Sequence, residues 1–417
     1  MERNYHLKIQ VNDKLWIGCI VAFAVVLRLL IGGCYYNSVD TINYNIPWAQ
    51  GVGQGLLSAY SNIKNLDYPP LFPLLLYFIS GPIQHAVEVQ NVFLQMFWIK
   101  LIPIIFDGAL IILMYVIGRK YNRLFGIFLA TMWALNISAI FNCSFWGQTD
   151  SMFMFWIAVM FFSLKNKRPQ LACIFFALGC LTKLQMAYLA PILLLELFFY
   201  YKSKIAFSAL RTGIIVGVLG WLPFIIGSKN IFLPLDIYFG GFGKYNFINL
   251  NAFNLYGIGS NNWKPDSAPL IGSLTYQQWG TIVSIALLIS IVLVYVYLKW
   301  KKKHLPTVLH AAMFMNAIFL FSTKMHERYQ IPVVVLSLLS FVFCQSWKYF
   351  YGYLGVTTIT FMNQAAYLLR KNFQGGFETH FESIQKVGSV LNLVLFIYLL
   401  YLYVNAVLKA TRNTSMK

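Results

Sequence analysis

The stretch "SFWGQTDSMFMFW" (144–156) places the polar run GQTDS between two strongly apolar segments. These flanks, 125–143 and 150–164, predict a pair of short membrane helices. A carboxylate at the edge of an apolar helix is costly unless it has a partner or a function. Asp150 is therefore the first candidate site residue, and we expect it at the outer end of the helix pair, facing the first loop of the chain.

The whole chain shares this apolar character. Of its 417 residues, 59% are hydrophobic and only 11% are charged, and the mean hydropathy is +0.64. Soluble domains carry about 25% charged residues, so the composition predicts an all-α polytopic membrane protein without a separate soluble domain. We expect about 11–13 transmembrane helices. Their predicted positions are 15–36, 94–118, 125–143, 150–164, 170–185, 187–201, 206–227, 279–299, 305–322, 331–347, 349–367 and 387–408.

Basic clusters between the apolar segments indicate the orientation of the chain. With both termini in the cytoplasm, every cluster falls on the cytoplasmic side, as the positive-inside rule requires. The clusters are Arg3/Lys8/Lys14, 119–123, 165–168, 202–204, 299–303 and Lys409/Arg412/Lys417. These short runs explain much of the formal charge of +19, and no nucleic-acid-binding arm or motif accompanies them. Acidic residues collect in the outer segments instead, so the chemistry is expected on the non-cytoplasmic face.

The sequence favours neither a metal site nor a disulfide framework. The six cysteines lie in or beside apolar segments and form no CxxC pair. The N-terminal apolar stretch lacks a small-residue cleavage site, which predicts a retained first span rather than a removed signal peptide.

The first outer segment, 37–93, carries two polar clusters. Asp40, Tyr44 and Trp48 are spaced like one side of an amphipathic helix on the membrane surface, although Asp40 as a simple N-terminal cap is the alternative. Asp67 precedes a Tyr-Pro-Pro turn and an apolar stretch that is short for a span, which predicts a half-embedded helix. The turn alone explains Asp67 as well as a function does.

A third outer cluster lies at the junction 322–332, "STKMHERYQIP". Its dense charge predicts an anion site, because Arg and Lys bind phosphate and His adds a further hydrogen bond. The alternative is a patch of snorkelling basic side chains. The ionisable residues of this cluster are Lys324, His326, Glu327 and Arg328.

Three ionisable residues fall inside or at the end of predicted spans, where such groups are functional hypotheses by default. Lys183, in "LTKLQ", lies near the outer end of the fifth span. Lys100 and Asp107 lie seven residues apart on one face of the second span. We expect these two either to pair structurally or to bracket a polar site.

Taken together, one face of the protein offers the carboxylates Asp40 and Asp150 and a cationic set. A carboxylate can take a proton from an acceptor hydroxyl, and cations can stabilise a departing phosphate. These residues suit displacement at a carbon that bears a phosphate, with the lipid tail of that phosphate in the bilayer. Walker, GxGxxG, HExxH and GxSxG chemistries are missing from the sequence.

The order of these motifs resembles the GT-C superfamily of polytopic membrane glycosyltransferases. The likeness is closest to mannosyl- and glucosyltransferases that use polyprenyl-phosphate sugars, and it covers residues 15–335. The motifs that carry it are the early-loop Asp40, "DYPPL" (67–71), "NCSFWGQTDS" (142–151), "LTKLQ" (181–185), "NLNAFNLYG" (249–257) and "TKMHERYQIP" (323–332).

The resemblance implies a GT-C fold, an exoplasmic active site and inversion at the anomeric carbon. Asp40 matches the catalytic base, and Asp150 matches the acidic residue of the second outer loop, which orients acceptor or donor. The positions implied near the donor phosphate are Lys183, Lys324, His326 and Arg328. The implied supporting residues are Asp67, Tyr68, Gln148 and Glu327. Most such enzymes use their monophosphate donor without a metal, so no metal or other cofactor is expected.

The expected reaction moves a hexose of the mannose or glucose type from undecaprenyl- or dolichyl-phosphate to a hydroxyl of a glycan, glycolipid or protein. Membrane lipids are expected partners and nucleic acid is not. The expected location is a bacterial plasma membrane, with the endoplasmic reticulum as the alternative. A transporter or flippase of a lipid-linked sugar is the leading alternative function, ahead of a non-catalytic assembly subunit. The predicted modules are 1–227, the outer loop 228–278, and 279–417.

Overall fold

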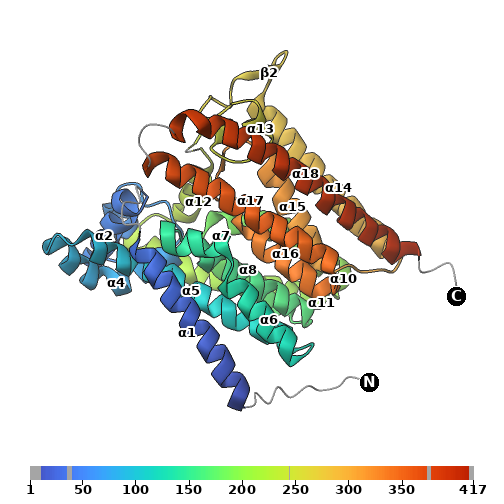
Figure 1. Ribbon diagram of the computed structural model, residues 1–417, viewed down its shortest axis with the longest axis horizontal. Coiled ribbons are helices and arrows are strands. Elements are labelled where there is room, and N and C mark those ends of the chain that lie inside the picture. Colours follow the sequence, from blue (N-terminus) through green and yellow to red (C-terminus); the bar gives the residue numbers. More distant parts are fainter. Residues whose placement is uncertain (1–10, 35–39, 244, 373–376, 413–417) are drawn as a thin grey trace.

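The computed structural model describes residues 11–34, 40–243, 245–372 and 377–412, which form an almost wholly helical structure (Figure 1). The predicted all-α class is confirmed. The helices are α1 (Val11–Gly33), η1 (Thr41–Asn45), α2 (Ile46–Gln54), α3 (Ala59–Asn62), α4 (Leu71–Glu88), α5 (Val92–Arg119), α6 (Arg123–Ala134), α7 (Ile137–Ile140), η2 (Phe141–Trp146), α8 (Asp150–Lys165), α9 (Pro169–Cys180), η3 (Leu184–Leu189), α10 (Ala190–Tyr200), α11 (Ser203–Ser228), α12 (Leu233–Gly243), α13 (Leu255–Ile258), α14 (Tyr276–Trp300), α15 (Thr307–Phe321), α16 (Ile331–Cys344), α17 (Trp347–Asn372) and α18 (Phe377–Arg412). The strands are β1 (Asn249–Leu250), β2 (Pro269–Ile271), β3 (Leu274–Thr275) and β4 (Met325–His326).

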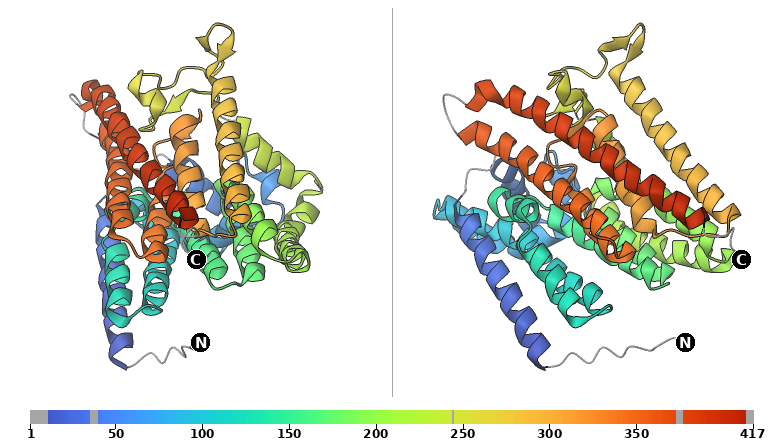
Figure 2. Two further views of the ribbon diagram at one scale, coloured as in Figure 1. Left: turned by 90° about the vertical axis from the view of Figure 1, so that its right-hand side faces the viewer. Right: turned by 45° about the vertical axis from the view of Figure 1, so that its right-hand side comes forward.

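Buried and lipid-facing helices are clearly separated. Helices α15 and α16 are buried along nearly their whole length in the main apolar core. Helices α1, α11 and α14 are also apolar but leave most of their surface uncovered. An exposed helix that is apolar all round is expected where the neighbour is lipid. Helix α1 lies at one flank of the molecule, and α17 and α18 run side by side as a hairpin (Figures 1 and 2).

The twelve predicted spans all overlap helices of the described chain. Within the described residues, five helices are long and apolar enough to cross a membrane, and α6 with α7–η2, bent by 43°, makes a sixth if it forms one span. By length alone, the number of membrane-spanning helices is therefore smaller than the expected eleven to thirteen. The reason is that several helices next to the polar clusters are short. These shorter apolar helices are Pro169–Cys180, Leu184–Tyr200, Thr307–Phe321 and Ile331–Cys344.

The basic clusters lie at one set of helix ends, at the start of α1, at four helix–helix junctions and at the end of α18. Following the chain from these ends places the segments 144–149, 181–183 and 322–330 at the opposite ends. The described structure thus keeps the predicted separation of basic runs from polar clusters. Arg3, Lys8 and Lys417 lie outside the described residues, and the compartment that each face meets stays a prediction.

The predicted outer segments contain secondary structure of their own. The first holds η1 and α2, followed by the longer helix α4, so helices lie where they were predicted, and their position at the membrane surface stays a prediction. The segment 228–278, predicted as a loop, forms α12, α13 and the strands β1 to β3. Strand β1 pairs in parallel with β4, so that Asn249 lies opposite Met325 and Leu250 opposite His326. This pairing ties the segment to the junction 322–330. The division into modules at 227 and 278 stays a prediction.

A buried ion pair joins α1 to α5, and its partners differ from those predicted. Asp107 pairs with Arg28, whose Nε lies 2.5 Å from Oδ2, and also accepts a hydrogen bond from Trp133. Arg28 donates further to the carbonyl oxygen of Ala134 at the end of α6. The predicted pairing of Asp107 with Lys100 is wrong, because the spacing along one helix does not reveal a cation on another helix.

Lys100 instead donates hydrogen bonds to backbone carbonyl groups of two other helices. Its Nζ donates to the carbonyl oxygens of Gly32 (2.8 Å) and Phe145 (3.0 Å), at the end of α1 and within η2. Backbone carbonyls that are freed at helix ends need donors when water is scarce. Lys100 therefore joins three segments structurally and does not line the cavity described below.

Replacing Asp107 with Ala should leave the fully buried guanidinium of Arg28 without a counter-ion. We expect the free energy of unfolding to fall by about 3–5 kcal/mol, measured by denaturant unfolding in detergent micelles. The double variant Arg28→Met/Asp107→Leu removes both charges and should recover most of that loss. A double variant no more stable than Asp107→Ala would contradict the assignment of this ion pair as the cause.

Candidate active site

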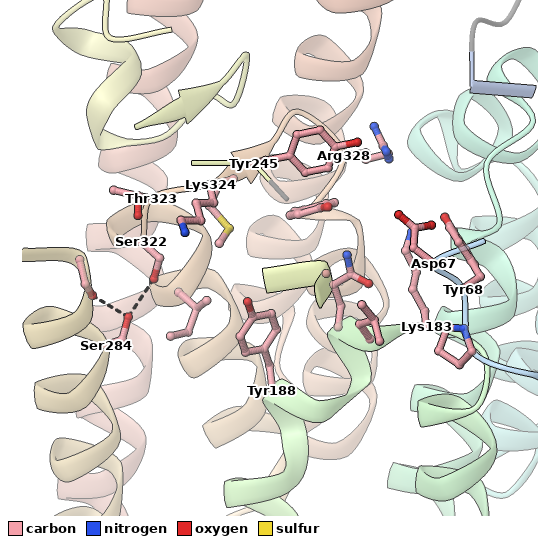
Figure 3. Close-up of a pocket in the computed structure, with 18 of the residues that line it drawn as sticks. Asp67, Tyr68, Lys183, Tyr188, Tyr245, Ser284, Ser322, Thr323, Lys324 and Arg328 are labelled. Carbon is pink, nitrogen blue, oxygen red and sulfur yellow. Dashed lines mark hydrogen bonds between the residues drawn. The ribbon is translucent and has the colours of Figure 1, made fainter. Parts of the chain in front are cut away.

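A cavity of about 550 Å³ opens among the polar clusters (Figure 3). Its walls come from the first-segment helices, the turn before α8, the break between α9 and η3, one face of α14 and the junction 322–330. Predicted site residues that line it are Asp40, Asp67, Tyr68, Gln148, Lys183, Lys324 and Arg328. Asp150, His326 and Glu327 do not line it. The structure thus brings most of the predicted residues together around the cavity, and the other three lie in the same region without lining it.

The run GQTDS forms a sharp reversal between η2 and α8. Gly147 has φ +83°, a left-handed conformation that glycine adopts without strain, and it ends η2. The carbonyl oxygen of Asn142 accepts hydrogen bonds from the backbone N–H of Gly147 and of Gln148. The turn directs the Gln148 side chain to the first segment, where its Nε2 donates to Oδ2 of Asp40 at 2.7 Å.

Asp40 is accessible from the cavity. Its side chain is 36% exposed, and the guanidinium of Arg328 lies 3.9 Å from Oδ2, the oxygen that Gln148 also contacts. Neither of these two contacts involves Oδ1. A carboxylate that is positioned through one oxygen and reachable from a cavity has the geometry of a general base.

Asp150, in contrast, forms a buried ion pair, and both of its carboxylate oxygens have protein partners. It lies in the first turn of α8 and pairs with Lys183, while Asn142 donates to its second oxygen at 3.0 Å. Lys183 reaches it from an extended residue between α9 and η3. Both side chains are almost fully buried, and a buried charge persists only with such partners. This is the partner that the carboxylate in "WGQTD" requires.

The junction 322–330 holds Arg328 between two carboxylates. Glu327 is buried, which by itself raises its pKa, but His326 and Arg328 outweigh burial and hold that pKa below its usual value. Its Oε1 accepts from Arg328 at 2.7 Å. Arg328 thus lies between buried Glu327 and cavity-facing Asp40, and its guanidinium also stacks over Trp146.

His326 supports this junction from behind the cavity wall. Its ring lies between those of Tyr245 and Tyr329, with centroids 5.0 and 4.9 Å away. Burial lowers the pKa of its imidazole below the usual value, so the neutral form is favoured. A neutral imidazole that is mostly covered by protein adds little positive charge for an anion in the cavity.

Aromatic side chains form the wall beside Asp67. Tyr68 packs against Trp48 and Phe72, and Tyr60 donates a hydrogen bond to its backbone carbonyl oxygen. After the two prolines, the backbone N–H of Leu71 donates to the carbonyl oxygen of Leu181. The Tyr-Pro-Pro turn is thereby attached to the break that carries Lys183.

One wall of the cavity was missed from the sequence. Polar or small residues of α14 line it, and they recur at helical spacing: Gln277, Gly280, Thr281 and Ser284. Such a stripe at positions i, i+3, i+4 and i+7 of an otherwise apolar helix was a readable signal. It carried no charge, and the prediction concentrated on ionisable residues.

These features define a polytopic membrane protein of the glycosyltransferase class, because residues 66–323 match a family model for that activity. The model is that of glycosyltransferase family 87, it covers more than half of the chain, and the chain belongs to this family. Family membership favours an enzyme over a transporter. A comparison with curated proteins finds none that matches the chain.

The matched range contains only part of the cavity. It includes Asp67, Gln148 and Lys183 but begins after Asp40 and ends before the residues 324–328. The roles of Asp40 and of this last stretch therefore rest on their geometry.

Replacing Lys183 with Met should leave Asp150 buried without its cation. We expect the free energy of unfolding to fall by about 3–5 kcal/mol, measured in detergent micelles. The double variant Lys183→Met/Asp150→Asn should recover much of it, since no uncompensated charge remains. Lys204→Met, at an exposed position in α11, is the matched control. Equal instability of the single and double variants would show that Lys183 acts elsewhere.

Proposed function

We propose that this enzyme transfers a hexose from a polyprenyl-phosphate donor to an acceptor hydroxyl, with inversion at the anomeric carbon. The active site is the cavity around Asp40, and the arrangement belongs to the GT-C type. The site faces the side of the membrane opposite the basic clusters, which the positive-inside rule makes the outer side.

One observation carries this proposal: a single cavity joins a carboxylate and cations to an apolar, membrane-facing wall. Asp40 and Arg328 lie at its polar part, and Ile285 and Leu288 of α14 line its apolar part. Ile285 is also 53% exposed on a helix with little protein cover. A ligand that fits both parts has an anionic head and an aliphatic chain, as a lipid-linked sugar phosphate does.

In the proposed reaction, the acceptor hydroxyl oxygen attacks the anomeric carbon while Asp40 takes the hydroxyl proton. The bond from that carbon to the phosphate oxygen breaks, and its electron pair leaves with the polyprenyl phosphate. Lys324 and Arg328, which line the cavity, stabilise the negative charge as it develops on the leaving group. Gln148 keeps Asp40 oriented through its 2.7 Å hydrogen bond.

Other parts of the proposal stay predictions. The sugar is of the mannose or glucose type, the acceptor is a glycan, glycolipid or protein, and the mechanism needs no metal ion. The predicted location is a bacterial plasma membrane, with the endoplasmic reticulum membrane as the alternative.

Changing Asp40 to Asn should remove the base but keep the fold, because the side chain retains its size. We expect transfer to fall by about a hundredfold or more. The measurement uses protein in nanodiscs, a panel of radiolabelled polyprenyl-phosphate hexoses, and membrane extract as acceptor.

Asp236→Asn is the control for that experiment. Asp236 lies in α12, where Asn230 donates to it, and it does not line the cavity. Near-normal turnover of Asp40→Asn would contradict the assignment of the base. Movement of the lipid between leaflets, with no label transferred from any donor, would contradict the proposed reaction itself.

A further inference from the structure

The cavity has two polar sides that the sequence did not distinguish. Figure 3 shows them on opposite sides of Tyr188. On one side lie Asp67, Tyr68 and Lys183, and on the other lie Ser284, Ser322, Thr323 and Lys324. We call the second set, together with Thr281 of the same helix face, the hydroxyl–lysine wall.

Two separate segments build the hydroxyl–lysine wall. The hydroxyl of Ser284 on α14 lies 2.9 Å from that of Ser322, which follows α15. Gly280 permits this approach, because a Cβ at that position would meet the backbone nitrogen of Thr323 at 3.2 Å. The hydroxyl of Ser284 also donates to the backbone carbonyl oxygen of Gly280 at 2.7 Å (Figure 3). Because hydroxyl hydrogens rotate to suit their partners, an anionic oxygen in the cavity can replace that carbonyl oxygen as the acceptor.

Among the described residues, three cations line the cavity, and Lys324 is the most accessible of them. Its side chain is 23% exposed, against 16% for Arg328 and 6% for Lys183. Its carboxylate partner Asp266 lies 3.5 Å away, whereas Arg328 lies 2.7 Å from Glu327 and Lys183 is tightly paired with Asp150. Lys324 also donates a hydrogen bond to Oδ1 of Asn246 at 2.7 Å. An anion that enters the cavity therefore competes at Lys324 with one neutral amide and with the longest of the three ion pairs.

The apolar part of the cavity continues directly from this wall. Leu288 lies one helical turn, about 6 Å, beyond Ser284 along α14, and both line the cavity. Phe314 and Ile318 of α15 line the same part. An aliphatic chain attached to an anion at the hydroxyl–lysine wall can follow α14 to half-exposed Ile285 and so to the bilayer.

We propose that the hydroxyl–lysine wall binds the phosphate of the lipid-linked donor, with the lipid chain along α14. This inference rests on the proposed function and deepens it. The sugar then extends from the wall across the cavity towards Asp40, and the acceptor enters beside Trp48 and Tyr68. The structural ion pair of Lys183 and Asp150 lies outside the phosphate contacts.

Binding of farnesyl phosphate, a short polyprenyl monophosphate, tests this assignment by calorimetry on the full chain in detergent. Ser284→Ala/Ser322→Ala and Lys324→Gln should each bind it about tenfold more weakly than the unchanged protein, since each loses hydrogen bonds to a charged group. Ser290→Ala is the matched control, because Ser290 lies on the same helix, bonds only its own backbone at Ala286 and does not line the cavity. It should bind as the unchanged protein does.

Inorganic phosphate and farnesol separate the contributions of head and chain. Each should bind at least tenfold more weakly than farnesyl phosphate if head and chain bind together. Equal affinity for inorganic phosphate would overturn the path along α14. Unchanged affinity of the wall variants for farnesyl phosphate would overturn the phosphate assignment.

The Asp40→Asn variant distinguishes this inference from the proposed function. It should bind farnesyl phosphate normally yet transfer no sugar. Loss of transfer in Asp40→Asn, combined with normal binding in all wall variants, would overturn only the hydroxyl–lysine wall. Sustained transfer by Asp40→Asn would overturn the proposed base while leaving the binding result to stand.

Discussion

The ion pair of Asp150 and Lys183 is the interaction on which the polar half of this fold depends. In a bilayer-embedded interior, neither charge is tolerable alone, so the start of α8 and the break after α9 must meet. Gln148 lies two residues before Asp150, and the turn that brings Asp150 to Lys183 also brings Gln148 to Asp40. A structural requirement thereby positions a side chain that contacts the candidate base.

The same rule applies to each cation that lines the cavity in the described part of the chain. Lys183 has Asp150, Arg328 has Glu327 and Asp40, and Lys324 has Asp266. The differences lie in distance and exposure, and these set how readily each cation can exchange its partner for a ligand. Arg328 is held by two carboxylates, Glu327 at 2.7 Å and Asp40 at 3.9 Å, whereas the longer ion pair of Lys324 leaves that ammonium more exposed. The charges of the three cations are therefore balanced to different degrees across the cavity.

Much of this organisation was predictable because it follows from local patterns in the sequence. Apolar segments of span length predicted the helices, and the alternation of basic runs with polar clusters predicted that Asp40, Gln148 and Arg328 would share one face. Partners on different helices were not predictable from spacing along one helix, so pairing with Lys100 was one of the two alternatives for Asp107, and Arg28 was not considered. The hydroxyl side of the cavity was missed because Ser284 and Thr281 carry no charge, although their spacing was readable. The position of His326 beside Tyr245 accompanies the pairing of β1 with β4. Strands of two residues are too short to be predicted from sequence periodicity.

The pair of Arg28 and Asp107 also constrains how the chain is made. Arg28 is fully buried in the first helix, but its counter-ion is encoded 79 residues later, in α5. At ordinary synthesis rates of about 5–20 residues per second, that separation corresponds to roughly 4–16 s. During that interval the nascent first helix carries an arginine without its counter-ion, which lowers the stability of that helix in the bilayer. The stability of the first helix in the membrane is thus coupled to one electrostatic contact that forms only after α5 has been made.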